Sequence, residues 1–588
     1  MRGKPNEQGF WPNGLPAPDI ENGTNPVVTG TDATGYDRDD RYYFQSNVKL
    51  RVEVPNVEGL SFTATGVFDK DFRNRKRWQT PWTLYDLAGF DTNGDGEPDG
   101  MDSSGTPIFN ESLVPNQDAR LEQWSDEGQN TLVNLLANYE QDFEDHSISI
   151  LLGAERQQIK NSGFSAFRRF FPTTQIDQLS FGGEEQQNIE GGSSSLGDDI
   201  SRPNEALRQN FFTRLNYNYQ SKYLLEFVGR YDGSYIFPEG SRYGFFPSVS
   251  VGWRLTQEDW FRNATSFFDE LKLRASYGQT GNDRIEEWQF MSTYQFGAGY
   301  IFNNTANQSI FPARTPNPDV SWEVSNQFDV GIESSMFDDR LSLEVDYFNE
   351  LRTDILWFRN ASVPQTAGIN LPRENIGEVK AYGFDGSIGW REQFGTDFWL
   401  DVSLNGGYAT NEIKFWDEPP GAPEWQQSTG SPMTIDDNGN DYGLMYDVIG
   451  VFRDEAHVNS MPHWPDARPG DLIFRDVNED GQINGDDRIR TDRTGVPKWN
   501  GGLNISGQYR AFDFVILFQG SAGASQWVQT QSGDFGNYLS HFADQRWTPD
   551  NPDASGPRAF QREEEYWINQ RNTYFYMDTD YILSLIHI

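Results

Sequence analysis

Cysteine is absent from the 588-residue chain, which excludes disulfide bonds, zinc–thiolate centres and cysteine nucleophiles. Positive charge is scarce, because 47 Lys and Arg residues stand against 88 Asp and Glu residues, and the net charge is −41. A chain this acidic repels a phosphate backbone and has no basic stripe with which to neutralise one. We therefore expect no nucleic acid among its partners.

Long apolar runs are also missing. No segment approaches the roughly 18 consecutive apolar residues of a membrane-spanning helix. The residues after Met1, RGKPNEQGFWPNGLP, contain no apolar stretch of the signal-peptide type. A transmembrane β-barrel is not excluded by these absences, since its strands alternate apolar and polar residues and have low mean hydropathy. Aromatic residues make up 15% of the chain, too many for a disordered protein.

Signs of catalysis are few. The five histidines form no HExxH motif and no triad-like arrangement; they are His146, His457, His463, His541 and His587. A glycoside hydrolase needs two carboxyl groups about 5 to 10 Å apart, and no pair among the 88 acidic residues is singled out by its sequence context. We predict that the chain is not an enzyme.

Strict alternation of apolar and polar residues is the dominant pattern. In FWLDVSLNGGY (398–408) the residues at even positions are mostly apolar and those at odd positions are mostly polar. LSLEVDY (341–347) places Leu341, Leu343 and Val345 on one face and Ser342, Glu344 and Asp346 on the other. LKLRASY (271–277) repeats the split. Each segment is predicted to be a β-strand with one apolar and one polar face.

Strand length and connections narrow the fold class. Many alternating runs are about 9 to 11 residues long, which suits a tilted strand that crosses a bilayer, and several end in Tyr, Trp or Phe, as interfacial girdles do. Short turns such as MFDDR (336–340) and YRAFD (509–513) contrast with long loops, of which 417–492 is the longest. We predict one all-β domain over 1–588, an antiparallel transmembrane β-barrel with long extracellular loops. A soluble β-sandwich or propeller is the alternative.

Two segments have the spacing of calcium-binding loops. RDVNEDGQINGDDR (475–488) offers oxygen ligands at alternate positions of a twelve-residue frame, with Gly481 at the sharp turn. DTNGDGEPDGMD (91–102) repeats the frame. The candidate ligands are Asp476, Asn478, Asp480, Gln482 and Asp487 in one loop, and Asp91, Asn93, Asp95, Glu97 and Asp102 in the other.

These loops depart from the EF-hand pattern. The twelfth position is Asp in both, where an EF-hand has a bidentate Glu. Pro98 follows the turn glycine closely and would hinder an incoming helix. A polar turn that binds no metal is the alternative, because Asp, Asn and Gly favour turns in any case. We predict structural Ca²⁺ in these loops and no other cofactor.

Several longer segments resemble the SusC/RagA family of TonB-linked outer-membrane proteins of Bacteroidota. They are RLNYNYQSKYLLEFVGRYDGSYIFPEGSRYGFFPSVSVGWRLTQEDWF (214–261), LKLRASYGQTGN (271–282), NPDVSWEVSNQFDVGIESSMFDDRLSLEVDYF (317–348), ENIGEVKAYGFDGSI (374–388), RPGDLIFRDVNEDGQINGDDR (468–488) and QRWTPDNPDASGPR (545–558). The resemblance covers most of residues 40 to 580.

The resemblance implies that the chain is the barrel portion of a 22-stranded transporter. We expect this sequence to lack the signal peptide, N-terminal sandwich domain, TonB-contacting segment and plug of such proteins. At the other end, DTDYI (578–582) resembles the start of a further strand, but LSLIHI (583–588) does not continue as the family does. We interpret 583–588 as a candidate for non-native sequence and expect the final strands to be missing.

The resemblance also implies a function. We expect an active transporter or receptor in the outer membrane that imports a large nutrient, an oligosaccharide or a peptide. Its partners would be a SusD-like surface lipoprotein, the TonB complex and outer-membrane lipid. The alternative is a secreted, calcium-stabilised β-rich glycan-binding protein or adhesin, which would bury its apolar strand faces.

Overall fold

The computed structural model describes residues 9–18, 25–87, 106–114, 118–185, 189–191, 204–302, 305–359, 371–419, 421–434, 443–528, 540–559 and 570–587. The chain divides into two compact units. Unit 1 comprises Met1–Leu50, Ala64–Asn134 and Arg156–Leu207, and unit 2 comprises Arg51–Thr63, Leu135–Glu155 and Arg208–Ile588. Strands are by far the most frequent element, as predicted, and the single barrel domain stays a prediction.

Unit 1 consists mainly of long strands in the order β1-β2-β5-β6, whose far ends belong to unit 2. Their bounds are β1 (Gly35–Glu53), β2 (Leu60–Gln79), β5 (Arg120–Phe143) and β6 (His146–Arg169). Smaller elements are α1 (Pro26–Thr29), η1 (Asp32–Thr34), η2 (Leu179–Phe181), the hairpin β3 (Trp82–Leu87) with β4 (Phe109–Val114), and β7 (Ile189–Gly191), which pairs with β6. Trp78, Ala119 and Leu121 form the buried core of this unit.

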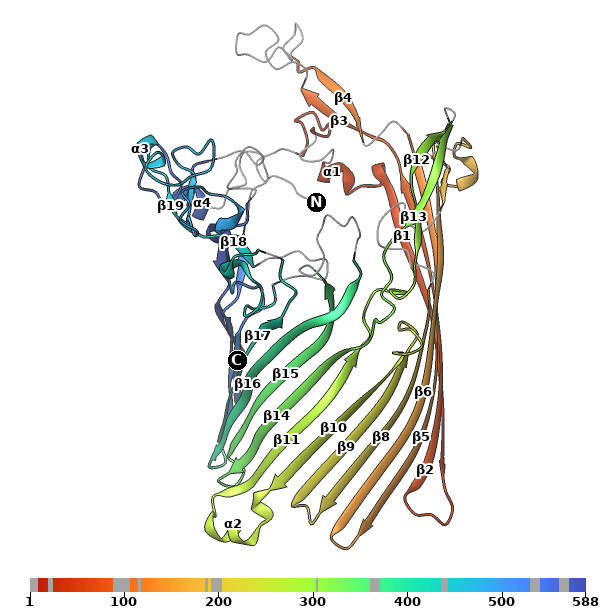
Figure 1. Ribbon diagram of the computed structural model, residues 1–588, viewed down its shortest axis with the longest axis vertical. Coiled ribbons are helices and arrows are strands. Elements are labelled where there is room, and N and C mark those ends of the chain that lie inside the picture. Colours follow the sequence, from red (N-terminus) through yellow and green to blue (C-terminus); the bar gives the residue numbers. More distant parts are fainter. Residues whose placement is uncertain are drawn as a thin grey trace. The chain divides into compact units, whose positions relative to one another are not determined.

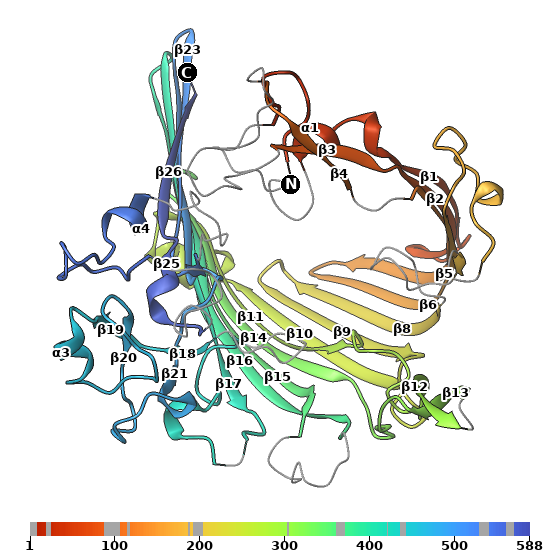
Figure 2. The same ribbon diagram turned by 90° about the horizontal axis from the view of Figure 1, so that it is seen from above.

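Unit 2 contains one large antiparallel sheet, whose strands follow one another in chain order. Figure 1 shows strands β8 to β17 side by side with a common tilt, and Figure 2 views the same strands from above. The strands are β8 (Asn204–Tyr219), β9 (Tyr223–Ser234), β10 (Tyr243–Arg254), β11 (Phe268–Asn282), β14 (Glu323–Met336), β15 (Leu341–Phe358), β16 (Arg373–Phe394), β17 (Phe398–Phe415), β22 (Trp499–Tyr509), β23 (Phe512–Ala522) and β26 (Tyr581–His587).

Connections at one end of this sheet are short. The predicted turns after Met336 and after Tyr509 are confirmed, because Met336 pairs with Leu341 and Tyr509 pairs with Phe512. Arg510 has a φ of 56°, the positive value that a two-residue hairpin turn requires. A short helical link, η4 (Leu255–Gln257) and α2 (Asp259–Ala264), joins β10 to β11 at the same end (Figure 1).

Connections at the other end are long and carry structure of their own. One contains the hairpin of β12 (Tyr294–Phe302) and β13 (Thr305–Pro312). Two other connections, from β17 to β22 and from β23 to β26, pack together. We refer to their packed part (residues 443–498, 540–559 and 570–578) as the loop subdomain. Its elements are β18 (Leu444–Tyr446), β19 (Val448–Val451), α3 (Glu455–Val458), β20 (Leu472–Phe474), η7 (Gly485–Asp487), β21 (Arg488–Arg490), α4 (Ser540–Asp544), η8 (Thr573–Phe575) and β25 (Tyr576–Asp578), and β24 (Ser525–Trp527) pairs with β25.

The loop subdomain has a hydrophobic core, although its sequence predicts a long irregular loop. Phe452, Trp464 and Phe474 are buried there together with Phe575, which comes from the second connection. Trp464 and Phe474 lie 5.1 Å apart between ring centroids. The segment is therefore a small packed body beside the end of β17 (Figure 1), and 3-10 helix η6 (Glu424–Gln426) precedes it.

Glycines line up across four neighbouring strands of unit 2. Gly386 lies opposite Gly406, which lies opposite Gly501, which lies opposite Gly520. We refer to these residues as the glycine row. A row without side chains leaves the backbone of the sheet uncovered on that face.

Strands β23 and β26 depart from alternation. Leu517 and Leu585 pair on the face that is polar elsewhere in the sheet, and Leu583 pairs with Gln519 on the same face. Residues 583–587 thus belong to a paired strand, and their non-native origin stays a prediction. Among the described residues, no helix is both long and apolar enough to cross a bilayer.

Candidate functional site

One face of the unit 2 sheet is apolar and exposed. Val345 of β15 lies opposite Ile332, and Leu404 of β17 lies between Ile388 and Leu503. Leu404 is 52% exposed and Val345 is 44% exposed. Residues of this kind are normally buried when they occur in contiguous rows. The exposed rows contradict the burial that the secreted alternative requires, and they fit a wall that faces lipid.

Aromatic residues bound these apolar rows at both ends. Towards the long connections, Tyr408 and Trp499 lie 4.7 Å apart between ring centroids, and Phe384 lies 5.8 Å from Trp499. Towards the short turns, Phe398 lies 5.3 Å from Phe394 and 6.4 Å from Tyr509. These are the two interfacial girdles that the strand ends predict.

The spacing of the two girdles matches a bilayer. Tyr408 follows Phe398 by ten residues in β17, which is about 34 Å along a strand that rises about 3.4 Å per residue. A tilt of about 45° reduces this to about 24 Å along the membrane normal. Outer-membrane barrels have an apolar band about 25 Å tall between their girdles. The apolar face of unit 2 is therefore the lipid-facing side.

The opposite face is polar, as the alternation predicts. Glu344 lies between Glu333 and Ser387, and Ser342 lies opposite Gly389. Further along, Asn405 lies opposite Gly502, and Asn500 lies opposite Gly407. We call this side of the unit 2 sheet the polar face.

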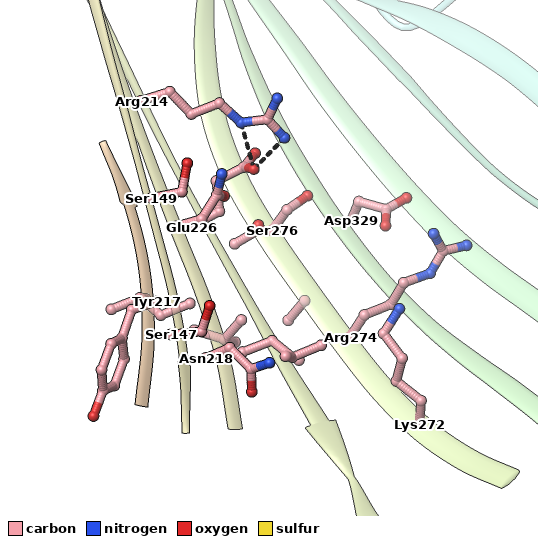
Figure 3. Close-up of a pocket in the computed structure, with 17 residues that line it drawn as sticks. Ser147, Ser149, Arg214, Tyr217, Asn218, Glu226, Lys272, Arg274, Ser276 and Asp329 are labelled. Atoms are coloured by element: carbon pink, nitrogen blue, oxygen red, sulfur yellow. Dashed lines mark hydrogen bonds and ion pairs between the residues drawn. The ribbon is translucent and has the colours of Figure 1, made fainter. Parts of the chain in front are cut away.

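Charged side chains on the polar face form a network around Arg274. Its Nη2 donates to Glu344 Oε1 at 2.9 Å and to Asp346 Oδ2 at 2.5 Å, and its Nε lies 3.3 Å from Glu333 Oε1. Lys272 Nζ donates to the same Glu333 at 3.1 Å. Figure 3 shows Arg274 and Lys272 beside Asp329 in a cavity of about 700 Å³, with Arg214 bound to Glu226 across it.

The predicted calcium loop at 476–487 adopts the turn that its sequence implies. The amide of Gly481, whose φ is 80°, donates to Asp476 Oδ2 at 2.9 Å. Backbone amides of Asp480 and Gln482 donate to the side chains of Asn478 and Asp480 at 3.1 and 2.8 Å. Asp476 Oδ1 is buried and accepts no hydrogen bond from the described residues. An orphaned carboxylate oxygen fits a cation at this half of the loop.

The twelfth position of the loop has a different role. Asp487 is completely buried, and its two oxygens accept the amides of Val477 and Asn484 at 2.9 and 2.8 Å. It thus closes the loop as part of the capping box of η7. Among the described residues, no three acidic or histidine side chains gather closely enough to hold a metal ion. Calcium binding here stays a prediction, and the loop with Asp91, Asn93, Asp95, Glu97 and Asp102 lies outside the described residues.

Neighbouring segments hold this loop and its subdomain in place. Trp425 Nε1 and Gln426 Nε2 donate to the carbonyls of Asp486 and Gly485 at 2.9 and 2.8 Å. Arg558 Nε donates at 2.8 Å to Asp471 Oδ1, and Asp471 is only 1% exposed. Sequence reasoning missed the contacts of Gln426 and Arg558, because the partners are 59 to 87 residues apart.

Tyr574 packs against the core of the loop subdomain. Burial there raises the pKa of its hydroxyl to about 12.

Comparison with known proteins identifies the family. A family model described as "TonB dependent receptor-like, beta-barrel" matches residues 3–552. TonB-dependent receptor P3 of Formosa agariphila is 29% identical over 448 residues, which are 74% of this chain and 43% of that protein. SusC of Bacteroides thetaiotaomicron is 24% identical over 398 residues, or 67% of this chain and 37% of SusC. The chain thus spans less than half the length of these curated relatives.

Solved structures show the same fold. The RagAB peptide importer in its closed-closed state matches 98% of this chain and 58% of its own chain, with a TM-score of 0.69 at 19% identity. A second RagAB structure matches 93% of this chain with a TM-score of 0.67. The long tilted strands, the lipid-facing side and the polar face agree with this likeness. The chain belongs to the TonB-dependent receptor-like β-barrel family of the outer membrane.

Proposed function

We propose that this chain forms the barrel wall of an active importer that takes up a large nutrient, an oligosaccharide or a peptide, across the outer membrane. The observation that carries the proposal is the two-sided wall of unit 2. Its apolar side extends about as far between the girdles as a bilayer is thick, and its other side presents charged and amide groups, such as those of Glu344 and Asn405.

The two sides have separate roles in the proposed mechanism. Lipid contact along Val345, Leu404 and their neighbours holds the wall in the membrane, since moving these side chains into water is unfavourable. The polar face borders a hydrated passage, in which hydroxyl, amide and charged groups replace part of the hydration of a polar solute. Energy would come from the TonB complex, and a SusD-like surface lipoprotein would close the outer opening. The names of the relatives, which are called TonB-dependent receptors, support the TonB complex as a partner.

We further propose that the loop at 476–487 binds one structural Ca²⁺. The cation would satisfy Asp476 Oδ1 and stabilise the loop subdomain by binding only the folded loop. Calorimetric titration with Ca²⁺ tests this. Asp480→Ala should abolish the heat of binding, whereas Glu479→Gln removes one charge at a position that is not a candidate ligand and should bind normally. Equal Ca²⁺ affinity in the two variants would refute the site.

Membrane insertion and uptake test the main proposal. The protein is expressed in a Bacteroidota host together with a SusD-like lipoprotein, and the outer membrane is then isolated. We expect a band that requires detergent for extraction and changes its electrophoretic mobility on heating. Uptake of labelled oligosaccharides and peptides is then compared in cells with and without TonB. A protein that is soluble without detergent would overturn the proposal.

A further inference from the structure

Three aspartates lie close together on the polar face of unit 2. Asp346 of β15 pairs directly with Asp385 of β16 and with Gly331 of β14, and Asp329 is the next residue along β14 on the same face. Directly opposed residues in an antiparallel sheet have Cβ atoms about 4.5 to 5.5 Å apart, and diagonal neighbours are about 7 to 8 Å apart. We refer to Asp329, Asp346 and Asp385 as the aspartate cluster.

This arrangement is electrostatically unfavourable by itself. Like charges directly opposite each other destabilise a sheet, and Asp346 is only 7% exposed. Its Oδ1 is buried and accepts no hydrogen bond from the described residues. Gly331 leaves the space that this oxygen occupies, because a Cβ there would collide with it. The sheet thus accommodates a carboxylate that it does not fully satisfy.

The local charge balance is negative. Among the described residues, Glu333, Glu344 and Asp346 share the two cations Lys272 and Arg274, and Asp329 and Asp385 bring the number of neighbouring carboxylates to five. Five minus two leaves an excess of three negative charges. Within the described part of the chain, Asp329 and Asp385 have no hydrogen-bond donor or ion-pair partner, although Arg274 lies near Asp329 in the same cavity (Figure 3).

Open space adjoins both of these carboxylates. Asp329 lines the cavity of about 700 Å³ and a neighbouring one of about 340 Å³. Asp385 lines a third, of about 500 Å³, together with the amides of Asn405, Asn500 and Gln519. A solute on the polar face can therefore approach Asp329 and Asp385 from the hydrated side.

We propose that the aspartate cluster binds the ammonium or guanidinium group of a basic side chain in the cargo, and so favours lysine- or arginine-containing peptides. This inference rests on the proposed import function and narrows its substrate class. A neutral oligosaccharide has no charge to neutralise the cluster, and an anionic one is repelled. An organic cation fits better than a metal ion, since no three acidic side chains of the described residues are close enough to coordinate one.

The absence of cysteine permits a direct test of the local potential. Ser276 lies opposite Asp329 and lines two of the cavities. In Ser276→Cys, the rates of modification by a cationic trimethylammonium methanethiosulfonate and an anionic sulfonate methanethiosulfonate are compared in the detergent-solubilised protein. After normalisation to a free thiol, we expect the cation to react about tenfold faster, because Asp329 lies directly opposite Ser276 and the carboxylates within roughly 15 Å exceed Lys272 and Arg274 by three.

Removing carboxylates should reduce this preference stepwise. Asp329→Asn in the Ser276→Cys background should lower the cation-to-anion ratio about threefold at moderate salt, and Asp385→Asn, which lies three strands and roughly 15 Å from Ser276, should lower it less. Asp401→Asn is the matched control, because Asp401 lies on the same face but is paired with Arg391 at 2.8 Å. Its ratio should stay within about twofold of the parent.

A ligand test uses trilysine, with trialanine as its neutral control. Millimolar trilysine should slow the reaction of the cationic reagent with the Ser276→Cys protein about threefold more than trialanine does, and Asp329→Asn with Asp385→Asn should remove this protection. Equal reaction rates for the two reagents, protection that is indifferent to these variants, or no reaction with either reagent would each overturn the proposal. Because labelling needs neither TonB nor uptake, these outcomes are distinct from failure of the proposed import function.

Discussion

Leu404→Arg provides a quantitative test of the lipid-facing side. Leu404 is 52% exposed, lies four residues from Tyr408 and six from Phe398, and is thus near the middle of the apolar band. An arginine near the midplane of an outer-membrane barrel costs about 2 to 4 kcal/mol of folding free energy. At an equally exposed position in water, the same change alters stability by about 0.5 kcal/mol or less. The two environments therefore give well-separated expectations.

The assay is equilibrium unfolding by guanidinium in phospholipid vesicles, followed by tryptophan fluorescence. Asn405→Arg is the control, because Asn405 is the next residue of the same strand and lies exposed on the polar face. We expect Leu404→Arg to lower the free energy of unfolding by about 2 to 4 kcal/mol and Asn405→Arg to change it by less than about 1 kcal/mol. Equal losses in the two variants would refute the assignment of faces.

Three further predictions concern the loop subdomain. Chelation of Ca²⁺ should speed proteolysis between residues 475 and 490, because the folded loop loses the cation that stabilises it. The strands of the sheet do not depend on this cation and should stay protected. Arg558→Ala should destabilise the subdomain by about 3 to 5 kcal/mol, measured by proteolytic susceptibility, since the buried Asp471 loses its cation. Tyr574 has a raised pKa, so its stabilising contribution is complete below pH 10 and falls as the pH rises towards 12, which a pH series of thermal unfolding measures.

Each of these predictions has a contradicting outcome. Chelation that leaves the proteolysis pattern unchanged argues against bound Ca²⁺. If Asp471→Asn with Arg558→Ala is no more stable than Arg558→Ala alone, an uncompensated charge is not the cause of the loss. Tyr574→Phe removes the titrating hydroxyl, and an unchanged alkaline decline in that variant would show that another group is responsible.

The strands of unit 2 are predictable from the sequence because a bilayer enforces alternation. The residues at even positions between Phe398 and Tyr408 face lipid, so the two-residue period persists over the whole strand. The loop subdomain has no such constraint. Phe452, Trp464 and Phe474 follow no period, and Phe575 joins them from a distant segment. Its core therefore became visible only in the folded chain.

The aspartate cluster was predictable only in part. Alternation places Asp346 on the polar face together with Ser342 and Glu344, as the structure confirms. That Asp385 lies opposite Asp346 depends on the register between β15 and β16, which shifts between Arg352 and Ile355. Sequence alone does not determine such a shift, since turn geometry and packing set it. The ion-pair network around Arg274 follows from the register of the neighbouring strands.

The glycine row has a mechanical consequence. A glycine inside a strand is less favourable than alanine by about 0.5 to 1 kcal/mol, so Gly386, Gly406, Gly501 and Gly520 together weaken the sheet by about 2 to 4 kcal/mol. Without side chains to stiffen it, the backbone along this line bends more easily than the rows on either side. We expect the sheet to bend along the glycine row, as at a hinge, whenever the curvature of the wall changes.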